Sequence, residues 1–265
     1  MSAIDQLFRD LKADGRKALM PFVTAADPDL EFTAMVLNQL VARGSHLCEL
    51  GIPYSDPIAD GPVIQASYTR ALAKQVKLSD IFAMLGRVTP DLAAPVVTMV
   101  SYAIVYRHGP QKYLADAKAA GVAGFIVPDL PVEESTALAA ICRAADVSLI
   151  QLVTPTTPRD RALRITESSS GFLYYVSVVG ITGERQELPP QLLDNVSWLR
   201  EQTELPICIG FGISQPEHVR RLAPVADGLI VGSAIVRRIA EAASRPRDEV
   251  LQEVGDYVET LLDAL

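Results

Sequence analysis

The sequence is poor in the residues that build disulfides and metal centres. Its three cysteines, Cys48, Cys142 and Cys208, are odd in number and form no Cys-x-x-Cys pair. This pattern argues against a disulfide framework and against a zinc site of the usual spacing. The three histidines are also far apart in the chain. We therefore expect buried, reduced thiols, no metal site and a cytoplasmic protein.

The sequence also lacks long apolar runs and an excess of positive charge. No run approaches the roughly 20 apolar residues that a membrane-spanning helix needs. The first 17 residues resemble no signal peptide and instead place Ile4, Leu7, Phe8 and Leu11 on one face of a helix. The net charge of −8 disfavours non-specific binding to nucleic acid or to an anionic membrane. The negative net charge is still compatible with a small anionic ligand that is held by backbone N–H groups.

What the sequence does contain is one pattern repeated along its whole length. A short apolar run ends in Gly, Pro, Asp or Thr, and an amphipathic segment follows. Such runs are typical of parallel strands that are buried on both faces. The predicted strands are Ala18 to Val23, His46 to Leu50, Pro95 to Val100, Gly124 to Val127, Leu149 to Val153, Phe172 to Val176, Pro206 to Ile209 and Gly228 to Val231.

Helical patterns fall between these runs, with further helices at the N-terminus, near Leu78 to Arg87 and at Asp248 to Leu262. Eight strand-then-helix units predict one domain over residues 1–265, an α/β fold of the (β/α)8 TIM barrel type with an extra N-terminal helix and additional helices. A doubly wound sheet is the alternative. It usually has fewer strands and a glycine-rich loop after the first strand, whereas PFVTAADP has no glycine there.

Candidate chemistry begins with the segment Glu49 to Gln65. Glu49 ends a strand that is otherwise uncharged, and a carboxylate in a barrel mouth loses hydration, which raises its pKa toward the working pH. Asp60 follows on the loop and is expected to fold back over the same mouth, although Asp60-Gly61-Pro62 is also a plausible helix cap. Asp56-Pro57 is an ordinary turn element.

A second feature is a late set of glycines after the last three strands. They are Gly183, the pair Gly210 and Gly212, and Gly232 directly before a helix. Loops after strands seven and eight are the usual phosphate site of the barrel fold. We therefore expect a phosphorylated small molecule, with aromatic groups lining the space between phosphate and carboxylates or filling the core. The aromatic candidates are Phe22, Tyr102, Tyr174 and Phe211.

The segment CELGIPYSDPIADGPVIQ resembles the signature of tryptophan synthase alpha subunits. PFVTAADP, GVAGFIVPDLPVEE, LVTPTTP, YYVSVVGITG, IGFGIS and VGSAIV follow in the family's order. The resemblance implies a lyase that cleaves indole-3-glycerol phosphate to indole and glyceraldehyde 3-phosphate by a retro-aldol reaction. Glu49 matches the family's acid–base carboxylate, and Asp60 matches the carboxylate that stabilises positive charge on the indole N–H. No metal and no Schiff-base lysine is required.

The resemblance also assigns the remaining contacts. Thr182, Gly183, Phe211, Gly212, Gly232 and Ser233 fall in the phosphate-side motifs, and Phe22, Tyr102 and Tyr174 fall near the indole and glycerol groups. The loop around Thr182 and Gly183 resembles the family's mobile lid. Family members assemble with a beta subunit as an αββα heterotetramer, and pyridoxal phosphate belongs to that partner, so this chain should bind no cofactor.

One departure concerns the partner. After the third strand the family usually reads Tyr-x-Asn, whereas this chain has Ile104 at the amide position. That loop lies near the subunit contact in the family, so the change bears on how the two subunits couple. Three alternatives stay open: another phosphate-binding barrel enzyme such as a sugar-phosphate isomerase, a noncatalytic activating subunit, and a stand-alone lyase that releases free indole. The segment from Glu49 to Asp60 argues against the first two.

Overall fold

A computed structural model describes residues 2–57, 60–177, 190–210 and 212–265. Within these residues, nine parallel strands form one sheet in the order β5-β4-β3-β2-β1-β9-β8-β7-β6. The strands are β1 (Ala18–Thr24), β2 (Cys48–Gly51), β3 (Val96–Met99), β4 (Val122–Ile126), β5 (Ser148–Ile150), β6 (Leu152–Val153), β7 (Leu173–Val176), β8 (Ile207–Gly210) and β9 (Gly228–Val231).

The sheet closes on itself at one short stretch of chain. Its two end members, β5 and β6, are the halves of a single segment separated by Gln151. The carbonyl of Gln151 accepts a hydrogen bond from the Tyr174 N–H at 3.1 Å, which continues the pairing to β7. The expected eight-stranded barrel is therefore confirmed, and its fifth strand is interrupted at Gln151.

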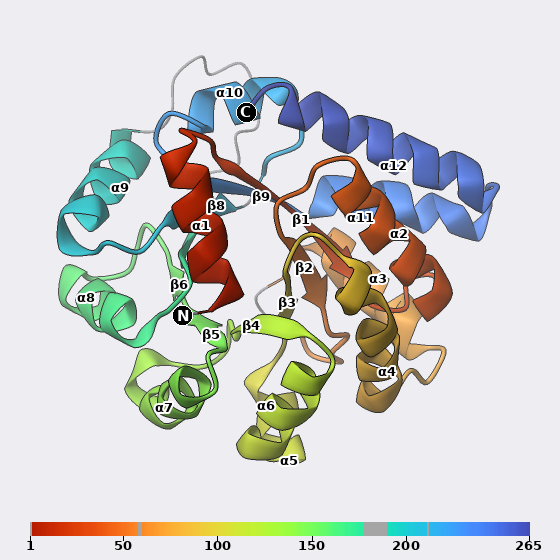
Figure 1. The fold of residues 1–265 in the computed structure, drawn as a ribbon, viewed down its shortest axis with the longest axis horizontal. Coiled ribbons are helices and arrows are strands. Elements are labelled where there is room, and N and C mark those ends of the chain that lie inside the picture. Colours follow the sequence, from red (N-terminus) through yellow and green to blue (C-terminus); the bar gives the residue numbers. More distant parts are fainter. Residues whose placement is uncertain (1, 58–59, 178–189, 211) are drawn as a thin grey trace.

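Helices surround the strands (Figure 1). The structure gives α1 (Ala3–Ala13), α2 (Leu30–Ala42), α3 (Pro62–Leu72), α4 (Leu78–Val88), α5 (Tyr102–His108), α6 (Pro110–Ala119), α7 (Thr136–Ala144), α8 (Arg159–Ser168), α9 (Pro190–Gln202), α10 (Pro216–Leu222), α11 (Ser233–Ile239) and α12 (Arg247–Leu262), with 3-10 turns η1 (Thr89–Asp91), η2 (Val132–Glu134) and η3 (Ala240–Ala243). Neither α5 nor α8 was predicted from the sequence.

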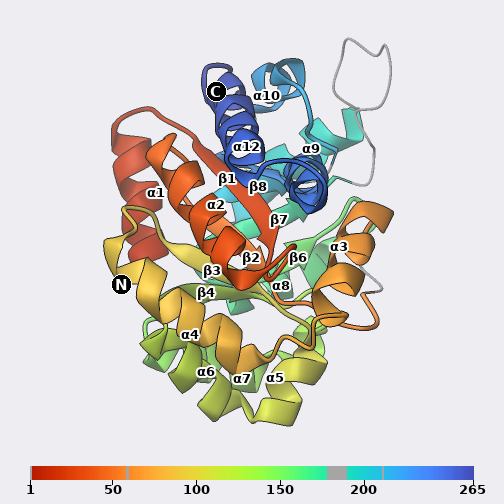
Figure 2. The ribbon, with the colours of Figure 1, turned by 90° about the vertical axis from the view of Figure 1, so that its right-hand side faces the viewer.

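Side chains alternate across each strand, so the sheet has an inner and an outer core. Along β1, Ala18 and Met20 point into the barrel, while Leu19 and Val23 pack against the helices outside. The amphipathic N-terminal helix α1 adds Ile4, Phe8 and Leu11 to the inner core. Figure 2 shows α1 and α3 at opposite ends of the barrel. The carboxyl ends of the strands therefore open at the end where α3 lies.

The cysteine side chains lie in the core of the protein. All three cysteines are buried and unbridged, as predicted, and burial raises the pKa of the Cys48 thiol to about 12. No helix in the described part of the chain is long and apolar enough to cross a membrane.

Candidate active site

Glu49 lies inside the barrel, near the carboxyl end of β2. It pairs in register with Phe22 of β1 and Val97 of β3. Its side chain is fully buried, and within the part of the chain that the structure describes neither carboxylate oxygen has a hydrogen-bond partner. Burial raises the pKa of this carboxyl well above its ordinary value. Glu49 therefore keeps its proton at pH values where an exposed glutamate has lost it.

Asp60 stands over the same end of the barrel, directly before α3. Its carbonyl accepts a hydrogen bond from the Gln65 side-chain amide at 2.7 Å, and its N–H donates to the Pro57 carbonyl at 3.2 Å. Partial burial raises the pKa of its carboxyl to about 6. At neutral pH Asp60 is thus mostly ionised, whereas burial favours the protonated form of Glu49.

The cap interpretation of Asp60 is not supported. The N-cap residue of α3 is Gly61, and the helix start has no side-chain cap hydrogen bond. Asp56, in contrast, is exposed and accepts a hydrogen bond from the Ser55 hydroxyl at 2.6 Å, which agrees with a turn element. Of the loop carboxylates, Asp60 is therefore the one available to a ligand in the mouth.

Helix α3 is tied to the end of β1 and to the loop after it by two polar contacts. Arg70 donates two hydrogen bonds to the buried carboxylate of Asp27, at 2.9 and 2.7 Å. The hydroxyls of Thr24 and Ser67 are 2.6 Å apart. A bidentate pair fixes orientation as well as distance. These contacts hold the face of α3 that looks into the mouth.

A cavity of about 270 Å³ lies at this mouth and is bordered by Asp60, whereas the fully buried Glu49 is not among the residues that line it. Phe22 and Tyr174 line it, together with apolar side chains of Ile64, Met99 and Ile230. Burial, with the nearby charges of Glu49 and Asp60, raises the pKa of the Tyr174 hydroxyl.

The two aromatic rings depend on glycines at strand ends. A Cβ atom on Gly51 would lie 2.4 Å from a ring carbon of Phe22, and a Cβ on Gly210 would lie 2.4 Å from the Tyr174 hydroxyl. Such distances are far inside van der Waals contact. The rings occupy the space that any larger residue would need.

The expected phosphate residues line the opposite side of the cavity. Gly212, with φ +76°, Gly232 and Ser233 all border it. The first turn of α11 starts at Ser233 and carries N–H groups that have no acceptor within the helix. Arg237, one turn further along α11, also lines the cavity. The sequence analysis missed Arg237, although its spacing of four from Ser233 places both on one helix face.

Not every predicted residue is brought to this cavity. Tyr102 lies at the start of α5, where its N–H donates to Asp129 at 2.7 Å and its ring lies 6.1 Å from that of Tyr106. It is not among the residues that line the cavity. Thr182, Gly183 and Phe211 lie outside the described residues, and so does the predicted lid.

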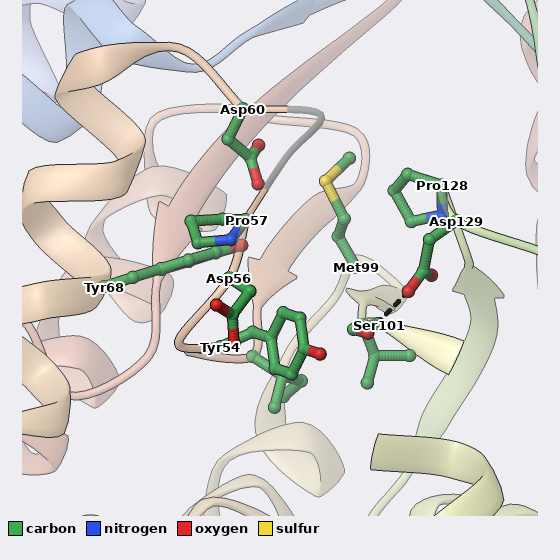
Figure 3. Close-up of a pocket in the computed structure, with 11 residues that line it drawn as sticks. Tyr54, Asp56, Pro57, Asp60, Tyr68, Met99, Ser101, Pro128 and Asp129 are labelled. Atoms are coloured by element: carbon green, nitrogen blue, oxygen red, sulfur yellow. Dashed lines mark hydrogen bonds between the residues drawn. The ribbon is translucent and has the colours of Figure 1, made fainter. Parts of the chain in front are cut away.

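A smaller cavity of about 40 Å³ adjoins the first. Asp60 and Met99 border both cavities, and Tyr54, Tyr68 and Asp129 line the smaller one (Figure 3). Tyr68 was not singled out in the sequence. Among the described residues, no group of three or more His, Cys, Asp or Glu side chains is arranged to hold a metal ion.

Comparisons with known proteins agree with this geometry. Residues 8–264 match the model of the family described as tryptophan synthase alpha chain. The tryptophan synthase alpha chain of Rhodopirellula baltica is 56% identical, with 100% of this chain and 99% of that protein covered. The crystal structure of tryptophan synthase subunit alpha from Legionella pneumophila superposes with a TM-score of 0.90 at 35% identity, over 100% and 98% of the two chains.

A third relative is a chain in the crystal structure of tryptophan synthase from M. tuberculosis in its aminoacrylate-bound form. It has a TM-score of 0.88 and 26% identity, with 100% of this chain and 99% of that chain covered. The match to the family extends over almost the whole sequence, and the barrel fold is the same throughout. The chain therefore belongs to the tryptophan synthase alpha chain family.

Proposed function

We propose that this chain cleaves indole-3-glycerol phosphate to indole and glyceraldehyde 3-phosphate, the alpha reaction of tryptophan biosynthesis, with Glu49 and Asp60 as its catalytic residues. The observation that carries the proposal is the pair of carboxyls at one barrel mouth with different proton affinities. Glu49 is fully buried, and Asp60 has a pKa of about 6. Pairs of groups whose environments separate their pKa values are typical of acid–base sites.

The cleavage needs two proton transfers and one bond rupture. Protonated Glu49 donates its proton to C3 of the indole ring and then, as the carboxylate, accepts the proton of the side-chain hydroxyl. The bond between C3 and the adjacent side-chain carbon breaks, its electron pair returns to the ring, and the alkoxide carbon becomes the aldehyde. Positive charge that develops on the ring N–H during this sequence is stabilised by ionised Asp60.

The rest of the cavity positions the substrate. Phe22, Tyr174 and Met99 offer an apolar site to the indole ring. Gly212, Gly232 and Ser233 offer backbone N–H groups and a hydroxyl to the phosphate, and Arg237 adds positive charge. Thr182, Gly183 and Phe211 on the phosphate side, and Tyr102 near the indole, remain predictions from the family resemblance.

We also infer a tryptophan synthase beta subunit as partner, in an αββα heterotetramer whose pyridoxal phosphate is bound by the partner alone. Support comes from the family and from α5. Tyr106 on this helix is 71% exposed, and tyrosine is enriched at interfaces between subunits. Ile104, at the amide position of the family, packs in part against the outer core. A cytoplasmic location stays a prediction.

The test is an indole-release assay with indole-3-glycerol phosphate on the purified chain, alone and with a cognate beta subunit. Wild type should release indole slowly alone and faster with the partner. Glu49→Gln and Asp60→Asn should each reduce cleavage by at least about 100-fold, the size of a general acid–base contribution. Full activity without any effect of the partner would identify a stand-alone lyase. No cleavage under either condition would favour a noncatalytic activating subunit.

A further inference from the structure

Tyr68 is the buried phenol at this mouth that the proposed mechanism does not use. It lies on α3, is 3% exposed, and packs with Phe22, Ile64 and Val236. Tyr68 also lines the smaller cavity, so its hydroxyl is available to a ligand or to a neighbouring side chain.

The Tyr68 hydroxyl is directed at the reacting end of the barrel. A Cβ atom on Gly51 would lie 2.7 Å from this oxygen. Gly51 and Glu49 are two residues apart on β2 and point to the same face, about 6.6 Å apart along the strand. The hydroxyl therefore lies about two residues further than Glu49 toward the carboxyl end of β2, on the open side of the barrel.

The same hydroxyl faces Asp60 across the smaller cavity. Tyr68 and Asp60 both line that cavity, and in Figure 3 the Asp60 carboxylate points toward the end of the Tyr68 ring that carries the oxygen. Burial raises the pKa of Tyr68, and the charges of Asp60 and then Glu49 raise it further. The phenol thus stays protonated and able to donate, and it lies within electrostatic reach of both carboxyls.

We propose that Tyr68 is a positioning residue of the cleavage reaction, whose hydroxyl donates a hydrogen bond to the Asp60 carboxylate when substrate occupies the cavity. Asp60 is the better acceptor of the two carboxyls because it is ionised at neutral pH, and hydrogen bonds to a charged acceptor are the stronger ones. The bond would keep Asp60 ionised and directed at the indole N–H. This inference rests on the proposed function and adds one residue to it.

Other titratable and charged groups also surround Asp60. They are Tyr54 and Asp56 on the loop between β2 and α3, Glu49 on β2, Asp129 after β4, Tyr174 on β7 and Arg237 on α11. Replacing Tyr68 by phenylalanine leaves all of these in place and removes one oxygen atom. Any change in the protonation of Asp60 then reports on that oxygen.

The experiment compares the pH dependence of indole release for wild type, Tyr68→Phe and the control Tyr113→Phe. Tyr113 is buried in the outer core, with its hydroxyl 3.3 Å from that of Thr98, and so matches the chemical change away from the mouth. We expect Tyr68→Phe to lower kcat about tenfold near neutral pH, which is about 1.4 kcal/mol. KM should stay within about twofold of the wild-type value, because the hydrogen bond from Tyr68 to Asp60 affects the reacting step rather than substrate binding. The acid limb of its profile should move to higher pH, since the ionised form of Asp60 loses a donor.

Three outcomes overturn the assignment. An unchanged kcat and an unchanged acid limb would show that the hydroxyl takes no part. A loss that is equal at every pH, or equal to that of Tyr113→Phe, would show a packing role only. If the wild type itself releases no indole, the proposed function fails, and the assignment of Tyr68 fails with it.

Discussion

Because the pKa of Asp60 is raised, we expect the stability of the folded protein to depend on pH even without substrate. A carboxyl whose pKa is higher in the folded than in the unfolded protein binds more protons when folded, so folding loses stability as the pH rises through that range. For Asp60 the range runs from 3.8 to about 6. At about 1.4 kcal/mol per pKa unit, keeping this carboxylate ionised costs up to about 3 kcal/mol. Because the group is partly exposed, screening by solvent reduces the figure to about 1–2 kcal/mol.

The substitution Asp60→Asn removes this cost while it keeps the size of the side chain. Above pH 6 the variant should melt about 2–8 °C higher than wild type, at about 2–4 °C per kcal/mol for a domain of this size. The difference should shrink toward zero as the pH falls below 3.8. Melting curves by circular dichroism from acid to neutral pH measure it, and the same variant should lack cleavage activity.

The control is Asp56→Asn, which makes the same chemical change on an exposed side chain of the same loop. It should shift the melting temperature by less than Asp60→Asn at neutral pH. An Asp60→Asn variant that is no more stable than wild type at neutral pH would refute the reasoning. So would a gain that persists unchanged in acid, because the gain would then have no connection with ionisation.

Three further substitutions test the surroundings of the site. Gly51→Ala should lower the free energy of unfolding by about 1–3 kcal/mol through overpacking and raise KM. Gly86→Ala on α4, whose Cβ would meet no atom closer than 3.8 Å, should do neither; urea unfolding and steady-state kinetics measure both variants. Arg70→Ala leaves the buried carboxylate of Asp27 without its partner and should lower the free energy of unfolding, measured in urea, by about 3 kcal/mol. A decrease of less than about 1 kcal/mol, the size expected for a surface pair, would contradict a structural role for Arg70. Glu49→Gln should stabilise the protein above pH 4.5, because it removes the cost of a carboxyl whose pKa burial raises, and it should abolish activity. A variant less stable than wild type at neutral pH would argue against the raised pKa.

The strands could be predicted because they are buried on both faces. Such strands appear as short aliphatic runs, and a charge among them is conspicuous, as Glu49 is in β2. Helices α5 and α8 could not be predicted in this way. In α5 only Val105 is buried, and α8 buries only Ala162, Ile165 and Thr166. Neither helix therefore has an apolar stripe of the usual width.

The candidate site was only partly visible in the sequence. Its carboxylates and glycines lie at strand ends, where the barrel fold predicts function. Tyr68 and Arg237 lie inside helices, among residues that look like an ordinary helix face. Their role depends on which way each helix turns its side chains toward the mouth, and that direction is set by tertiary contacts such as the pair of Arg70 with Asp27.

The closure of the sheet at Gln151 also restricts how this protein meets other chains. An open sheet presents unpaired N–H and C=O groups along its edges, and a second polypeptide can add a strand there. Here the two edges are consecutive pieces of one segment, each already paired to its neighbour. Within the described residues, a partner therefore has no free sheet edge to extend, and any partner subunit has to be recognised by the loops and helices around the barrel.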